Sequence, residues 1–273
     1  FMVAVSENNW LGKGIRFISQ LNVSEEKISG NLSMNNPNYN YSGNAVFTSL
    51  NVSSLDAKAT SGYESTKSGF SLGTSFEQYE NVFLTPSFDA IYEDVEVTSS
   101  SSSAIKKMDG TFYNLDFGYA IAWDRRNQAF QPTDGYVTKF SQTLPLIQDS
   151  SAIVNGFEAS AYHAFSEDVI GSIKFQGRAI HGVDGNVRLT KRLFIPNSKL
   201  RGFNTAKVGP KDGEDYVGGN YYYTLGVDAQ LPNLLPEVYK TDFSLFLDTG
   251  NVWNVDYSNT LTDTDKVRAA VGI

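Results

Sequence analysis

The sequence lacks cysteine, has only two histidines and contains no long apolar run, and each absence removes a class of function. Without cysteine there is no disulfide framework, zinc-thiolate site or thiol chemistry. His163 and His181 have no serine or second ligand at a recognisable spacing, so we expect no metal site and no serine nucleophile. No run approaches the roughly 20 apolar residues that a membrane-spanning helix needs.

Basic residues are also fewer than acidic ones. The sequence has 22 Lys and Arg against 30 Asp and Glu, a net charge of -8, which argues against a nucleic-acid partner because phosphates attract clustered cations. Aromatic residues and glycine are frequent, with 15 Tyr, 18 Phe and 23 Gly. With a slightly negative mean hydropathy, this composition suits a soluble β-protein or a membrane barrel, in which only alternate residues face lipid.

Apolar and polar side chains alternate along most of the sequence. Between residues 169 and 179, Ile173 and Phe175 fall on one face while Lys174 and Gln176 fall on the other. The alternation predicts about thirteen strands, mostly about ten residues long, the length that crosses a bilayer when tilted. The predicted strands cover residues 1–9, 14–24, 27–35, 43–53, 68–79, 81–95, 111–123, 135–145, 152–165, 168–181, 219–231, 241–249 and 266–273.

The connections between these strands differ in length. Short turns are predicted at 80–81 and 167–168, and longer polar loops at 54–67, at 96–110 with its run Ser99 to Ser103, and at 182–218. Short turns on one side and long loops on the other are typical of membrane barrels, whereas a soluble sandwich has shorter strands and less asymmetry. The predicted fold class is an all-β, antiparallel transmembrane β-barrel.

Two features predict that strands are missing from this barrel. The strand count is odd, although single-chain bacterial barrels have an even number. The sequence also begins Phe1-Met2-Val3, within a strand, and its last segment stops without a turn. We expect a mature fragment.

The segment 182–218 is too long for a simple connection, because structureless loops above about 15 residues are usually functional or disordered. Short motifs follow one another along it and recur elsewhere in the sequence. Within the segment they are Phe194-Ile195-Pro196, Lys199-Leu200-Arg201-Gly202-Phe203, Val208-Gly209-Pro210 and Gly218-Gly219-Asn220. Elsewhere they are Asn9-Trp10-Leu11-Gly12, Asp124-Arg125-Arg126, Pro132-Thr133-Asp134-Gly135 and the run from Phe246 to Trp253.

In this order the motifs resemble the Omp85 superfamily, most closely its outer-membrane assembly branch, over essentially the whole sequence. The resemblance implies a sixteen-stranded barrel, of which residues 1–273 would hold strands two to fourteen as an incomplete barrel domain without the preceding POTRA domains. It also implies a sixth loop that folds into the lumen. The residues that match this arrangement are Arg201, Gly202 and Phe203 at the loop tip, Asp248 and Gly250 in the aromatic-x-Asp-x-Gly strand motif, Asp228 at a nearby position where the family usually has Glu, and Gly209, Pro210, Gly218 and Gly219 as loop support.

The residues alone favour the same contact. Alternation puts Asp228 and Asp248 on the polar faces of strands that should pair, because strands joined by a hairpin are neighbours. An arginine from an inserted loop can bridge two carboxylates with its planar fork of donors. We expect Gly202 to allow close backbone approach and Phe203 to add packing.

Other interpretations of these residues remain open. The two aspartates could be solvated carboxylates, and Arg201 an ordinary surface arginine. An acid–base pair is a third interpretation, which an adjacent arginine disfavours because it would keep both acids ionised.

The function that the resemblance implies is folding and insertion of β-barrel proteins into the bacterial outer membrane. It implies client outer-membrane proteins, lipids and accessory lipoproteins as partners, with no cofactor, metal, catalytic residue or nucleic acid. The alternatives are a TamA-like or two-partner-secretion translocation barrel, a passive porin, and a barrel lipase, for which no Ser-His pair is visible.

Overall fold

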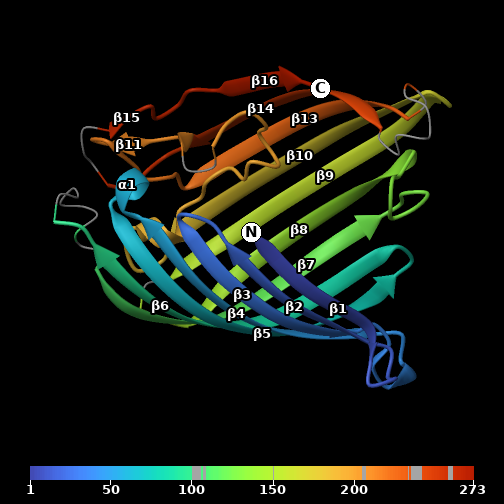
Figure 1. Ribbon diagram of the computed structural model, residues 1–273, viewed down its shortest axis with the longest axis horizontal. Helices are drawn as coiled ribbons and strands as arrows, with labels where there is room; N and C mark the ends of the chain where they lie inside the picture. Colours follow the sequence, from blue (N-terminus) through green and yellow to red (C-terminus); the bar gives the residue numbers. More distant parts are fainter. Residues whose placement is uncertain are drawn as a thin grey trace.

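Thirteen strands form one antiparallel sheet in which each strand pairs with its neighbour in chain order (Figure 1). The computed structural model describes residues 1–99, 106, 109–149, 151–204, 207–232, 234, 242–257 and 261–273. The strands of this sheet are β1 (Met2–Trp10), β2 (Ile15–Val23), β3 (Lys27–Asn36), β4 (Ala45–Ala57), β5 (Tyr63–Tyr79), β6 (Val82–Val97), β7 (Gly110–Asp124), β8 (Asp134–Gln148), β9 (Ala152–Ser166), β10 (Val169–Gly182), β13 (Tyr221–Leu231), β14 (Phe243–Trp253) and β16 (Arg268–Gly272).

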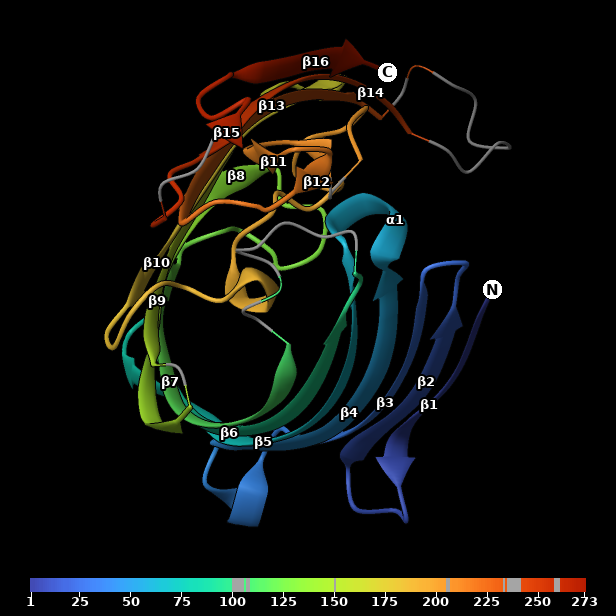
Figure 2. The ribbon, with the colours of Figure 1, turned by 90° about the vertical axis from the view of Figure 1, so that its left-hand side faces the viewer.

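The sheet curls into most of a ring, with β1 and β16 as its two edges (Figure 2). Most of the connection from β10 to β13, described for residues 183–204 and 207–220, lies inside this ring; we call it the inward loop. It contains a 3-10 turn, η2 (Leu189–Lys191), and two short strands, β11 (Lys211–Asp212) and β12 (Asp215–Tyr216). Strand β11 also pairs with β15 (Leu261–Thr262), so a small second sheet ties the inward loop to the β14–β16 connection.

The named helical elements of the described residues are single turns. The helix α1 (Lys58–Ser61) joins β4 to β5, and the 3-10 turn η1 (Tyr39–Tyr41) precedes β4. None of the helices among the described residues is long and apolar enough to cross a membrane.

All thirteen predicted strands are present, but the predicted loop at 54–67 is wrong. Strands β4 and β5 extend through it and pair from Ser53 with Lys67 to Ala57 with Tyr63, which leaves only α1 and Gly62 between them. The predicted contrast between short and long connections is correspondingly weaker. The long segment at 182–218 is confirmed, whereas Ser100 to Ser103 lie outside the described residues.

The curved sheet exposes apolar side chains and buries polar ones. On β13 and β14, Val227 and Leu247 are 43% and 51% exposed on the convex face, whereas Asp228 and Asp248 on the concave face are 5% and 2% exposed. This arrangement is the reverse of a soluble protein, in which exposed apolar patches of such extent are rare. It is the pattern of a sheet with lipid outside and polar contents inside.

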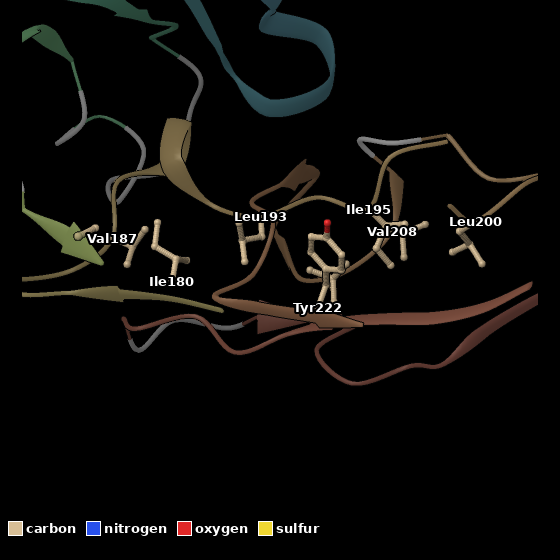
Figure 3. Close-up of a cluster of buried hydrophobic side chains, with 9 residues drawn as sticks. Ile180, Val187, Leu193, Ile195, Leu200, Val208 and Tyr222 are labelled. Carbon is tan, nitrogen blue, oxygen red and sulfur yellow. The ribbon is translucent and has the colours of Figure 1, made fainter. Parts of the chain in front are cut away.

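The concave face carries the inward loop on two apolar clusters. The first joins the loop to β9, β10, β13 and β14, and Figure 3 shows Tyr222 pointing from its strand into the loop side chains. Its buried members are Ala152, Ile180, Val187, Leu193, Ile195, Leu200, Val208, Tyr222 and Val252. The second cluster joins Leu189 and Val217 of the loop to Ala57, Tyr63 and Val95 of β4, β5 and β6. Burial on both sides holds the loop in the lumen.

Candidate functional site

The predicted loop tip lies against the inner wall of β13 and β14. Leu200, 1% exposed, seats the chain in the first apolar cluster just before Arg201. Gly202 then turns the backbone with φ of +84°, a conformation that favours glycine. The nearest atom to a Cβ at Gly202 would be the Ala270 Cβ at 3.7 Å, an ordinary contact. The expected close approach at Gly202 is therefore wrong, and the left-handed turn is the reason for glycine.

Arg201 contacts both predicted aspartates. Its Nε and Nη2 donate to the two carboxylate oxygens of Asp248, each at 2.6 Å, and its backbone N–H donates to the same carboxylate at 3.0 Å. The guanidinium also lies 2.8 Å from Asp228 Oδ1. This bidentate geometry is the strong form of a charge-assisted hydrogen bond. The contact predicted from alternation and loop motif is confirmed; we call these three residues the Arg201 anchor.

Two further side chains complete the cluster and were not predicted. Lys174 on β10 donates to Asp228 Oδ2 at 3.0 Å, so two cations face two carboxylates. The Phe246 ring centroid lies 3.7 Å from the guanidinium carbon of Arg201, within cation–π range. The hydrogen bonds that Arg201 donates to Asp248 raise the pKa of Arg201 above its ordinary value, so the pair stays ionised. The strand register places Lys174 opposite Gly226, and Gly226 opposite Asp248, so Lys174 and Asp248 lie in one row across three strands. Alternation within each strand gives the face of Lys174 but not this register, so the contact was not predicted.

Glycines let the loop lie close to the wall. A Cβ at Gly250 would come within 2.9 Å of the Tyr223 carbonyl and 3.1 Å of Ile195 Cδ1 on the loop. A Cβ at Gly209 would come 2.8 Å from the Val252 Cβ. Real Cβ atoms essentially never approach other atoms within 3.0 Å, so neither position has room for a side chain unless its neighbours shift.

The remaining predicted loop residues make contacts within the inward loop or with the first apolar cluster. Gly219 exchanges backbone hydrogen bonds of 3.0 and 2.9 Å with Leu193, and Gly218 has φ of +63° beside it. The Pro210 carbonyl accepts from the Val217 N–H at 3.0 Å. Phe203, partly buried, packs on the first apolar cluster. All ten predicted site residues therefore lie on the inward loop or on the wall that it covers.

The chemistry available here is electrostatic. Two carboxylates and two cations neutralise each other beneath a loop, and each carboxylate is almost completely buried. Breaking such a pair leaves an uncompensated buried charge, so the cluster fixes the loop in one position. The described residues include no group of His, Asp and Glu that could hold a metal ion.

Fold and site together define an antiparallel outer-membrane-type barrel segment whose long loop is held inside by an ion-pair cluster. A model of the Omp85 superfamily domain matches residues 9–273, and the chain belongs to that superfamily. The chain therefore has the fold of an outer-membrane β-barrel.

Among proteins of known function, the chain is similar to the outer membrane protein assembly factor BamA of Neorickettsia risticii, with 26% identity over 192 residues. It is also similar to the human sorting and assembly machinery component 50 homolog, with 26% identity over 187 residues. These matches cover 68% and 63% of this chain but only 25% and 39% of the two relatives. The chain thus spans less than half the length of either.

Solved structures agree on the fold. BamA from Haemophilus ducreyi lacking POTRA domains 1-3 superposes with a TM-score of 0.81 and 18% identity, over 99% of this chain and 60% of that one. CdiB from Acinetobacter baumannii superposes less well, with a TM-score of 0.57, 12% identity and coverage of 93% and 46%.

Proposed function

We propose that this chain is the barrel portion of a machine that folds and inserts β-barrel proteins into the bacterial outer membrane. The observation that carries the proposal is the Arg201 anchor, which holds the inward loop against β13 and β14 in a barrel of the Omp85 superfamily. Similarity to a bacterial assembly factor and to a sorting and assembly component supports it further.

The work proposed for this barrel needs no covalent step. Backbone groups of an unfolded client strand seek partners, and a sheet edge supplies them. The barrel's own contribution is a stable wall and a filled lumen, which the inward loop provides. Its proposed partners are client outer-membrane proteins, outer-membrane lipids and accessory lipoproteins, and it uses no cofactor.

Reconstitution tests the proposal. The full chain is placed in lipid vesicles, an unfolded β-barrel client is added, and its folded fraction is followed by gel mobility without heating. Vesicles that contain the chain should fold the client faster than empty vesicles or vesicles with an unrelated barrel. Equal rates would contradict the proposal.

Two other outcomes point to the alternatives. Large, steady conductance in planar bilayers without faster client folding would indicate a passive porin. Transfer of a secreted protein into the vesicle interior, again without client folding, would indicate a translocation barrel.

A further inference from the structure

A second buried ion-pair cluster lies on the opposite wall of the lumen. Glu93 is on the concave face of β6 and is 2% exposed. From its own wall it accepts Ser65 Oγ at 3.0 Å and pairs with Lys67 Nζ at 3.0 Å. From the inward loop it pairs with Arg188 Nη2 at 3.4 Å and accepts Thr190 Oγ1 at 3.1 Å. A buried carboxylate needs such partners, and two of these four belong to the loop.

The loop segment that reaches Glu93 is seated by further contacts. Leu189 is 1% exposed in the second apolar cluster. The guanidinium carbon of Arg188 lies 3.7 Å from the Phe112 ring centroid, and Lys191 Nζ donates to Asn114 Oδ1 at 3.1 Å. Strands β6 and β7 therefore supply partners to one turn of the loop, while Ser65 and Lys67 of β5 contact Glu93 from its own wall.

We propose that Glu93 is a positioning residue and that its contacts with Arg188 and Thr190 form a second anchor for the inward loop. This Glu93 anchor fixes the start of the loop to β6, whereas the Arg201 anchor fixes the tip to β13 and β14.

The two anchored walls are far apart in the order of the sheet, so the loop spans the lumen between them (Figure 2). The segment between the anchors is itself packed, because Leu193, Ile195 and Leu200 belong to the first apolar cluster. The loop thus acts as a strut that links two walls which do not pair with each other. This inference concerns the barrel itself and holds whether or not it inserts other barrels.

The second anchor is tested in the full chain by the accessibility of introduced cysteines. The 273 residues contain no cysteine of their own, so each introduced cysteine is the sole thiol among them. Leu189→Cys reports on the Glu93 anchor and is called the start reporter, and Leu200→Cys reports on the Arg201 anchor and is called the tip reporter. Both leucines are only 1% exposed, so a cysteine at either position reacts only when the loop opens. Each reporter is labelled with a maleimide in the background of Glu93→Gln and of Arg188→Met. Glu64→Gln is the matched control, because Glu64 lies on β5 and pairs with Lys58 rather than with the inward loop.

Glu93→Gln and Arg188→Met should each raise the labelling rate of the start reporter by about ten-fold or more, through local opening, and leave that of the tip reporter within about two-fold. The control should change neither rate. Unchanged labelling of the start reporter in barrels that keep their compact gel mobility would overturn the proposal, as would equal increases at both reporters. If Glu93→Gln fails to fold, Arg188→Met decides alone, since it leaves Glu93 paired with Lys67 and Ser65.

Discussion

At the scale of single residues, Arg201 joins the inward loop to two buried carboxylates of the wall. Asp248 accepts three hydrogen bonds from Arg201, one from the backbone and two from the side chain. The Asp248 side chain is 3% exposed and the Arg201 side chain 34%, so the carboxylate loses its water while the arginine keeps part of its own. Removing the arginine therefore costs more than a surface ion pair would.

A double-mutant cycle measures this pair. Arg201→Ala, Asp248→Ala and the double variant are unfolded in urea, and the coupling is the difference between the double change and the sum of the single ones. We expect a coupling of about 1–3 kcal/mol, because both groups are charged and their hydrogen bonds are short. Additive effects within about 0.5 kcal/mol would show that the contact contributes nothing of its own.

Lys191 should make the stability of the barrel depend on pH. Burial, followed by the nearby charge of Arg188, lowers the pKa of Lys191 from 10.5 to about 8, against the opposite influence of Asp116 and Glu93. Between these values the unfolded chain holds a proton that the folded chain has released, so stability rises with pH. Relative to Lys191→Met, the wild type should gain stability from pH 8 to 10.5. If the difference in urea midpoint between wild type and Lys191→Met does not change between pH 8 and pH 10.5, the lowered pKa of Lys191 is contradicted.

The residue types explain what could be predicted from the sequence. Asp228, Asp248 and Arg201 could be brought together because strand alternation fixes the inward face and a loop motif marks the tip. Glu93 and Arg188 could not, because alternation gives the face of Glu93 but not which loop residue crosses the lumen to meet it. That pairing depends on how the inward loop folds, and an irregular loop has no repeating pattern of apolar and polar residues from which its path could be predicted.

At the scale of elements, the strands vary in length around the sheet. Strands β1 and β2 have 9 residues each, whereas β5 has 17 and β6 has 16. A bilayer crossing takes about 9–11 tilted residues, so β5 and β6 extend past the hydrocarbon. Beyond it the outer face no longer meets lipid and the period-two signal disappears, which is why residues 54–67 resemble a loop in sequence although they pair.

Gly250 tests the close packing of loop and strand. Gly250→Ala places a Cβ 2.9 Å from the Tyr223 carbonyl and 3.1 Å from Ile195 Cδ1, so strand or loop must shift. We expect a loss of about 1–3 kcal/mol in the free energy of unfolding, the usual cost of overpacking. Gly30→Ala in β3 is the control, because nothing lies within 4 Å of its added Cβ. Equal effects at the two glycines would disprove the packing argument.

At the scale of the whole molecule, two polar clusters and two apolar clusters bind one loop to both sides of a curved sheet. The outer face carries the apolar side chains, so lipid rather than an internal core accounts for much of the burial of this chain. Inside the sheet, the two apolar clusters and the two ion-pair clusters together hold the loop against the wall. The position of the loop therefore depends on ion pairs and apolar contacts inside the sheet, and the burial of the outer face depends on lipid.

The most direct measurement is the rate at which vesicles containing the full chain fold an added β-barrel client, with wild type and Arg201→Ala compared at equal amounts of folded barrel. Loss of the Arg201 anchor frees the loop tip from β13 and β14, and we expect client folding to slow by about ten-fold, the effect of roughly 1.4 kcal/mol. Arg201→Lys should recover only part of the rate, since lysine lacks the bidentate fork. Equal rates for wild type and Arg201→Ala would contradict the account.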